Sequence, residues 1–187
     1  MAARKRVVEI ANYDEAWPEA FEKERELLVV TIGAYLTGSI EHVGSTSVPG
    51  LAAKPIVDIQ VGVAGLEESR PVFGALEAIG YSYDSICPHV MHFFDKRVPG
   101  KQPYNLQLIP YRSNCWNMRI AFRDYLRLHP EIAQEYAALK RELARRFRLE
   151  HAAYGEGKSP FIRRIARRAL RPSHGDRDRA SSSCSPQ

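Results

Sequence analysis

The sequence predicts a mixed α/β (α+β) domain in which helices flank a small sheet and form most of the C-terminal half. Three short runs rich in β-branched or aromatic residues, at 56–63, 91–97 and 104–109, are typical of strands. From residue 114 onward, apolar residues instead recur at the spacing of amphipathic helices. With 187 residues, 44% hydrophobic and 26% charged, the chain has the composition of an ordinary globular domain.

The N-terminal part is expected to hold a short strand at 7–11, followed by a helix. The helix should begin near Trp17, because Pro18 is tolerated only in a first turn, and run to about Leu36. Apolar residues at helical spacing support this prediction: Trp17, Phe21, Leu28, Ile32 and Tyr35.

The middle of the chain alternates between strand and helix signals. A short segment at 40–43 leads into a run of small and turn-forming residues at 44–50, and the strand at 56–63 follows. A helix is expected over 66–79, with Gly80 as its C-terminal cap. After the strand pair at 91–109, one helix is predicted from residue 114, a second from 130, and a last short helix around 161–165.

The net charge of +5 is distributed unevenly along the chain. From Arg163 onward there are seven arginines and two acids, whereas residues 1–162 carry 20 basic and 20 acidic residues. We therefore expect a folded domain at 1–171 and a disordered, serine-rich basic tail at 172–187. Nucleic-acid binding is expected only through this basic segment, because phosphate neutralisation by arginine would be its basis.

No membrane association is expected from the sequence. No apolar run approaches the roughly 20 residues that cross a bilayer. The basic N-terminus, MAARKRVVEI, lacks the apolar stretch of a secretory signal. These features predict a cytoplasmic protein.

The most informative segment is HVGSTSVPGLAAKPIVDIQ, residues 42–60. Its glycines and hydroxyl residues lie between two strands, the second of which carries Asp58. A Gly-Ser turn lets backbone amides and a hydroxyl approach an anion, and Lys54 adds a full positive charge. The spacing of a Walker loop is absent. Two interpretations stay open on these residues alone: an anion-binding loop facing Asp58, or a tight serine-rich turn beside an ordinary buried acid.

This segment resembles known families. Gly44-Ser45 followed by an acid on a strand is similar to the nucleotidyltransferase superfamily signature, a Gly-Gly/Ser loop before a strand with alternating acids. More closely, IEHVGSTSVPGLAAKPIVDI resembles the hallmark of the GrpB family, a bacterial group placed in that superfamily. AFRDYLRLHPEIAQEYAALKRELARRF and GKSPFI resemble its C-terminal half, so the likeness covers about Val8 to Ile165.

The resemblance implies a nucleotidyltransferase-like core with a helical C-terminal extension that binds a nucleotide or a phosphorylated small molecule. Asp58 is implied to be the catalytic residue and to hold Mg²⁺, and His42 is expected to orient the turn. The implied phosphate-binding residues are Gly44, Ser45, Thr46, Ser47, Lys54, Arg123 and Lys158. Arg123 and Lys158 each keep a second interpretation, that of an ordinary surface charge.

The chain departs from the superfamily pattern at the metal site. Residues i and i+2 share a face of a strand, and here Asp58 is followed by Gln60 rather than by a second acid. On the neighbouring strand, where GrpB proteins often carry histidine, this chain has Asn105 and Gln107. His92 lies nearby in sequence, but a lone histidine is more often structural than a ligand.

The predicted function is therefore left between two classes. The first is Mg²⁺-dependent nucleotidyl or phosphoryl transfer to a small molecule. The second is non-catalytic binding, either of a ligand or of a partner held by the arginine-rich C-terminal segment. The family's association with dephospho-coenzyme A kinase also suggests a link to coenzyme A metabolism.

Overall fold

A five-stranded mixed sheet forms the centre of the protein in the computed structural model, which describes residues 7–171. The strands lie in the order β1-β2-β5-β4-β3. β2 and β5 pair in parallel, and the other neighbours are antiparallel. The bounds are β1 Leu36–Val43, β2 Val57–Val63, β3 Ser82–Asp84, β4 His92–Lys96 and β5 Tyr104–Pro110. This architecture confirms the predicted fold class.

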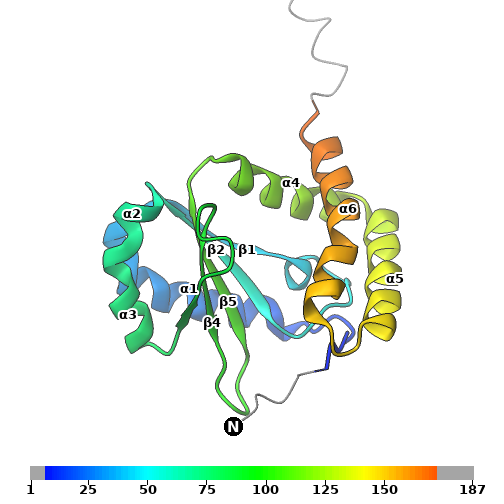
Figure 1. The fold of residues 1–187 in the computed structure, drawn as a ribbon, viewed down its shortest axis with the longest axis horizontal. Helices are drawn as coiled ribbons and strands as arrows, with labels where there is room; N and C mark the ends of the chain where they lie inside the picture. Colours follow the sequence, from blue (N-terminus) through cyan, green and yellow to red (C-terminus); the bar gives the residue numbers. More distant parts are fainter. Residues whose placement is uncertain (1–6, 172–187) are drawn as a thin grey trace, which may run out of the picture.

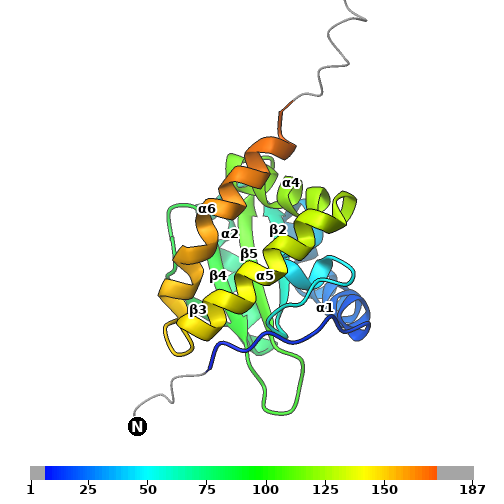
Figure 2. The ribbon, with the colours of Figure 1, turned by 90° about the vertical axis from the view of Figure 1, so that its right-hand side faces the viewer.

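Helices cover both faces of the sheet. One face carries α1 (Ala16–Ile32), α2 (Leu66–Ser69) and α3 (Phe73–Ala78), and the other carries α4 (Asn114–Leu128), α5 (Pro130–Arg146) and α6 (His151–Ala169). Figure 1 shows α2 and α3 on one side of the strands and α5 and α6 on the opposite side. In Figure 2 the α5–α6 pair crosses in front of the sheet. In residues 7–171, no helix is both long and apolar enough to span a membrane.

The alternation along β2 decides what each face of the sheet presents. Val57, Ile59 and Val61 are fully buried in the core shared with α1 and α3. Burying each such side chain stabilises the fold by about 1.5–3 kcal/mol. The intervening Asp58 and Gln60 therefore face the α4–α6 layer, because successive side chains on a strand point to opposite faces.

The parallel register carries this polar stripe onto the next strand. Asp58 is aligned with Asn105, and Gln60 is aligned with Gln107. Four polar side chains thus form two adjacent rows beneath α4–α6. This stripe is the floor on which the candidate site is built.

The N-terminal expectations need two corrections. The predicted strand at 7–11 is wrong: Ala11 makes a single bridge to Ala53, and the Val8 amide donates to the carbonyl of Arg148 in the turn after α5. The first helix ends at Ile32 rather than near Leu36. Leu36 instead opens β1, where it is paired with Val63, so strand pairing overrides the helical pattern.

Two helix predictions also change. The expected helix at 66–79 is divided into α2, a 3₁₀ turn at Arg70–Val72, and α3, because Pro71 has no amide to donate. The last helix is not short: α6 begins at His151 and contains Pro160. β3 was not predicted, and the expected tail at 172–187 lies outside the described residues.

Candidate functional site

The chain leaves β1 through a tight turn that is fixed by its own side chains. Gly44 has φ +71°, and residues Ser45–Ser47 form one 3₁₀ turn. The Ser47 hydroxyl donates to the Gly44 carbonyl at 2.6 Å. Thr46 Oγ1 donates to the Ile56 carbonyl at 3.4 Å and lies 3.0 Å from Nε2 of His42. The turn is therefore tied both to β1 and to the segment that enters β2.

His42 supports this turn as a neutral ring. Its imidazole stacks on Phe21, with centroids 4.8 Å apart. Burial, reinforced by the nearby Arg127 and Arg123 charges, lowers the pKa of His42 to about 4. At neutral pH the ring is uncharged, so we assign its Nε2–H as the donor to Thr46.

Asp58 lies directly beneath the turn, and its orientation is set by amides. Oδ1 accepts a hydrogen bond from Asn105 Nδ2 at 2.8 Å and a longer one from Gln107 Nε2 at 3.5 Å. The carbonyl oxygens of Gln60 and Gln107 both accept from Arg119, at 2.9 and 2.7 Å. These amides hold the carboxylate in one rotamer through a chain of hydrogen bonds.

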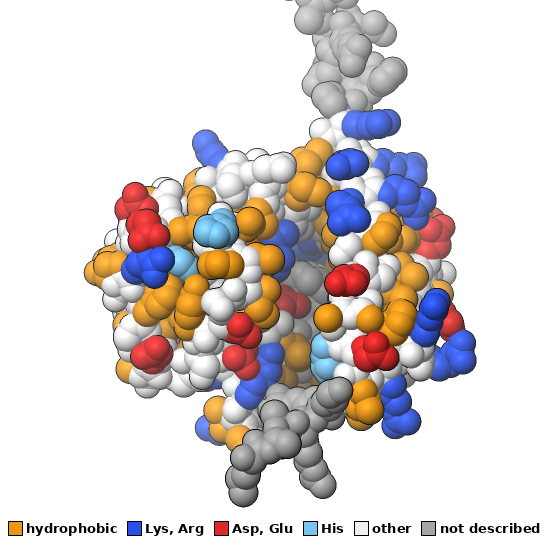
Figure 3. Space-filling view, in the orientation of Figure 1, with side chains coloured by type: hydrophobic (Ala, Val, Ile, Leu, Met, Phe, Trp, Pro, Cys, Tyr) orange, Lys and Arg blue, Asp and Glu red, His pale blue; other side chains and the backbone are white. Residues whose placement is uncertain are grey.

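A cavity of about 200 Å³ opens above this carboxylate, between the turn, the sheet, α5 and α6. We call it the lysine pocket, because Lys54, Lys140 and Lys158 approach it from three different segments. Figure 3 shows the surface hollowed between the sheet and the α5–α6 pair, with basic and acidic side chains inside the hollow. The lining residues are Ser45, Thr46, Ala53, Lys54, Ile56, Asp58, Asn105, Lys140, Tyr154 and Lys158.

Aromatic rings and a carbonyl hold the three ammonium groups. The Nζ atoms of Lys54 and Lys158 lie 4.6 and 4.5 Å from the centroid of the Tyr154 ring. Lys140 Nζ donates to the Ala52 carbonyl and lies 4.7 Å from the Tyr136 ring. Cation–π contacts of this kind partly replace the water that these ammonium groups lose.

The surroundings of the three lysines nevertheless disfavour their charged forms. Burial, with repulsion from Lys158 and Arg141, lowers the pKa of Lys140 to about 7. Burial and the Lys54 charge lower the pKa of Lys158 to about 8, although Asp58 opposes the shift. The pKa of Lys54 is also lowered, mainly by burial. One carboxylate does not compensate three ammonium groups.

Most residues singled out in the sequence meet here. Ser45, Thr46, Lys54, Asp58, Asn105 and Lys158 line the pocket, and Gly44 lies against Asp58. Gln60 and Gln107 lie farther along the same stripe, where they hold Arg119. Their roles toward a ligand stay predictions, but the geometry brings these side chains together. Lys158 is on helix α6, rather than in a loop before a helix.

Two predicted phosphate contacts lie elsewhere. Ser47 lines a different cavity, and its carbonyl accepts two hydrogen bonds from Arg127. Arg123 is 9% exposed and does not line the lysine pocket. It pairs with Glu41 at 2.6 Å and with Asp124 at 2.7 Å, and it donates to the His42 carbonyl at 3.0 Å. In this structure Arg123 fixes β1 to α4.

Sequence reasoning missed Lys140 and Tyr154. Lys140 is 2% exposed and lies on the buried face of α5, between Tyr136 and Leu143. A lysine placed within an apolar helical stripe was the available signal, because such a charge needs a reason to be buried. Tyr154 offered no comparable signal, since a tyrosine on an apolar helix face is ordinary.

The donor set around Asp58 does not fit a resident divalent cation. Within residues 7–171, no three His, Cys, Asp or Glu side chains are grouped closely enough to hold a metal. The neighbours of Asp58 are amides and ammonium groups, whereas Mg²⁺ prefers several oxygen ligands. His92 faces the opposite side of the sheet, where its Nε2 lies 2.8 Å from the Leu66 carbonyl and its ring packs on Phe73.

The arginine-rich C-terminal segment is only partly within the described residues. Its first arginines belong to the last turns of α6, where Figure 3 shows basic side chains gathered. Arg164 lies 4.0 Å from Glu135, and Arg168 lies over the Tyr125 ring. The remainder, from residue 172, lies outside the described part of the chain.

Comparison with known proteins identifies the family. The family model described as GrpB protein matches residues 7–168. The chain belongs to the GrpB family. The crystal structure of the conserved protein GrpB from Enterococcus faecalis superposes with a TM-score of 0.77 at 33% identity, covering 87% of this chain and 97% of that one. The sequence resemblance to GrpB proteins is thereby confirmed.

Two of the relatives are longer than this chain. The UPF0157 protein YqkA of Bacillus subtilis is 34% identical over 167 residues, which are 89% of this chain and 48% of YqkA. A protein named dephospho-CoA kinase from Mycolicibacterium paratuberculosis is 28% identical over 194 residues, covering 87% of this chain and 46% of that protein. The chain thus spans about half the length of each.

Proposed function

We propose that this GrpB-family chain binds the phosphate group of a small molecule, such as a nucleotide, in the lysine pocket. The observation that carries the proposal is the excess of charge. Three lysines and one carboxylate line the cavity, so it holds two more positive than negative groups when all are ionised. A phosphate monoester carries about −1.5 to −2 charges at neutral pH. It matches this excess once bound, because the anion favours the protonated forms of Lys140 and Lys158, whose pKa values are lowered to about 7 and about 8.

The chemistry of the lining supports a phosphate in particular. Lysine is a common phosphate ligand that acts as a point charge. Unlike a planar guanidinium, each of the three ammonium groups can contact a phosphate oxygen from any direction. The Ser45 hydroxyl, which lines the pocket, adds a neutral hydrogen-bond donor. Burial makes each charge–charge interaction stronger than it would be in water.

The size of the pocket limits what enters it. A volume of about 200 Å³ is below the roughly 300–1,000 Å³ typical of pockets that enclose a whole drug-sized ligand. The phosphate group is therefore expected to bind inside the pocket, while the remainder of a nucleotide or metabolite lies at its mouth. The identity of that remainder is set by groups outside the lysine cluster.

Calorimetric titration with inorganic phosphate, AMP and ATP tests the proposal. Lys158→Gln should weaken the binding of each phosphate compound by about tenfold or more, because it removes about one charge-assisted contact. Lys101→Gln is the matched control, since Lys101 is exposed and lies on the β4–β5 turn. Equal affinity in the parent chain and in Lys158→Gln would contradict the proposal.

Nucleotidyl transfer is the second candidate. It is favoured by the placement of Ser45 and Asp58 on one cavity and by the family resemblance. Such transfer would use Mg²⁺, for which this donor set is poor, so we derive no step through a metal. Release of pyrophosphate from nucleoside triphosphates, measured with and without Mg²⁺, tests turnover separately from binding.

Asp58→Asn distinguishes the two candidate functions, because they predict opposite changes in phosphate affinity. If lysines alone bind phosphate, removal of the Asp58 carboxylate from the pocket lining strengthens binding, because it removes a repulsive charge. If a metal held by Asp58 carries the phosphate, the same variant weakens Mg²⁺-dependent binding. The titration therefore requires both conditions, and the melting temperature of the variant confirms that it is folded.

A further inference from the structure

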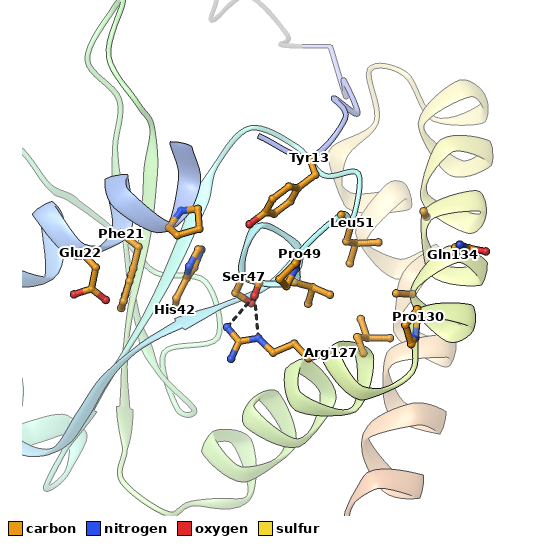
Figure 4. A pocket seen from close by; sticks show the side chains of 16 residues that line it. Tyr13, Phe21, Glu22, His42, Ser47, Pro49, Leu51, Arg127, Pro130 and Gln134 are labelled. Carbon is orange, nitrogen blue, oxygen red and sulfur yellow. Dashed lines mark hydrogen bonds between the residues drawn. The ribbon is translucent and has the colours of Figure 1, made fainter. Parts of the chain in front are cut away.

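A second and larger cavity lies on the other side of the turn that bears Gly44. It has a volume of about 810 Å³ and is bounded by α1, the turn and the α4–α5 corner. We call it the α1–α5 groove. Much of its wall is apolar, with contributions from Phe21, Val48, Leu51, Leu126, Ala133 and Ala137. Figure 4 shows the turn on one side and the α4–α5 corner on the other.

Most of the side chains that can form hydrogen bonds lie at one end of the groove, and the Gln134 amide is on the exposed rim at α5. Tyr13, His42 and Arg127 lie at that end, and Figure 4 shows Tyr13 and Arg127 on opposite sides of Ser47. His42 is uncharged at neutral pH, for the reasons given above. The Tyr13 hydroxyl can donate or accept a hydrogen bond, whereas the His42 ring, whose Nε2–H donates to Thr46, offers only Nδ1 as an acceptor.

Each charge that lines the groove has a neighbour of opposite charge, although burial and the nearby Arg123 charge still lower the pKa of Arg127. The Arg127 guanidinium donates to the Ser47 carbonyl at 3.0 and 2.8 Å and lies 3.9 Å from Asp124. Glu22 pairs with Arg25 at 2.6 Å. A charged ligand would lose its hydration here without gaining an unneutralised counter-charge, which is costly. This is the reverse of the lysine pocket, where positive charge is in excess.

We propose that the α1–α5 groove binds an uncharged small molecule, with an apolar body of one or two rings along α5 and a hydrogen-bonding group at the Tyr13–His42 end. Its volume lies within the roughly 300–1,000 Å³ of small-molecule pockets, and its apolar wall with a few polar groups at one end has their usual composition. The inference is independent of the phosphate proposal, because the lining lysines belong to the other cavity.

Two dyes with the same body test the charge requirement. N-phenyl-1-naphthylamine is uncharged, and 1-anilinonaphthalene-8-sulfonate carries the same ring system with one negative charge. Both emit strongly and at shorter wavelength in an apolar site. The neutral dye should bind the folded chain with saturable, one-to-one stoichiometry. Saturating inorganic phosphate should displace sulfonate bound in the lysine pocket and leave the neutral dye in place.

Substitutions on α5 assign the binding to the groove. Gln134→Phe places a ring at the exposed rim of the groove, and Ala133→Leu narrows the groove with a larger side chain. Each variant should bind the neutral dye about tenfold more weakly, which corresponds to a loss of about 1.4 kcal/mol of binding free energy. Glu135→Phe is the control, since this neighbouring position is exposed and does not line the groove.

Three results would overturn the inference. The first is no saturable binding of the neutral dye by the folded chain. The second is unchanged neutral-dye affinity in both groove variants, with melting temperatures showing that both are folded. The third is a dimer in sedimentation that Gln134→Phe dissociates, because a second copy of the chain would then be the occupant.

Discussion

The carboxylate of Asp58 lies where a side chain on residue 44 would begin. A Cβ atom built on Gly44 would be 2.5 Å from Asp58 Oδ2 and 3.0 Å from Asp58 Cβ. Contacts under 3 Å cannot persist, so the backbone reaches the acid only because residue 44 lacks a side chain. The glycine of the turn and the acid of β2 therefore form one structural unit.

We expect Gly44→Ala to destabilise the fold by about 3 kcal/mol, the sum of left-handed backbone strain and overpacking. Gly50→Ala is the matched control: Gly50 has φ +73°, but nothing lies within 4 Å of its Cβ position. The control should cost only about 1 kcal/mol, because it retains the strain without the clash. Denaturant unfolding of both variants measures the difference, and equal losses would show that the contact with Asp58 is unimportant.

The floor of the site could be predicted from the sequence. The alternation in β2 indicates a strand, and a strand places Asp58 and Gln60 on one face opposite the apolar core. The small residues at 44–50 indicate a turn directly before it. These signals are local, since each depends on a short stretch of neighbouring residues. Asp58 then lies beside Asn105 because β5 pairs in parallel with β2.

The part of the pocket formed by α5 and α6 could not be predicted in the same way. Gly155, Gly157 and Pro160 together are typical of a loop, yet all lie inside α6. Packing decides here: a side chain on Gly157 would come within 2.6 Å of Leu143, so the glycine lets α6 approach α5 closely. That approach brings Lys158 to the pocket. Tertiary contacts of this kind override local propensity.

The stability of the ligand-free chain should rise with pH between about pH 7 and pH 9.5. In the fold the pKa values of Lys140 and Lys158 are lowered to about 7 and about 8, while both lysines have the ordinary pKa of 10.5 after unfolding. The unfolded chain therefore binds more protons in this window, which makes the folded state more favourable as protons are removed. The gain should be several kcal/mol, since each proton lost contributes about 1.4 kcal/mol per pH unit.

Urea unfolding at several pH values measures this slope. Lys140→Met should flatten it, because the variant has no buried ammonium to deprotonate at that position. Lys101→Met, at an exposed position, should leave the slope intact. A parent chain whose stability falls over the same window would mean that these lysines are stabilised, rather than strained, by their surroundings.

Phosphate affinity should change in the opposite direction. The bound anion favours the protonated lysines, so its binding is accompanied by proton uptake above about pH 7. We expect affinity for a phosphate monoester to be about tenfold weaker at pH 9 than at pH 7. Calorimetry in buffers of different ionisation enthalpy counts the protons directly. Binding without proton uptake at pH 8 would place the phosphate away from these lysines.

Arg123 provides the test that separates a structural charge from a ligand-binding one. Its guanidinium is buried between Glu41, Asp124 and the His42 carbonyl. Arg123→Met leaves these acceptors without their donor and should destabilise the chain by about 2 kcal/mol. Arg145→Met is the control, because its pair with Glu142 is 78% and 58% exposed and should contribute little to stability.

Phosphate titration of the same variant completes the argument. Because Arg123 does not line the lysine pocket, Arg123→Met should keep the parent chain's phosphate affinity at temperatures where it remains folded. The sequence resemblance implies the contrary, a guanidinium on the phosphate and a marked loss of binding. A loss comparable to that of Lys158→Gln, in a variant with normal unfolding cooperativity, would mean that the ligand extends from the pocket to α4 and that Arg123 exchanges its acidic partners for the anion.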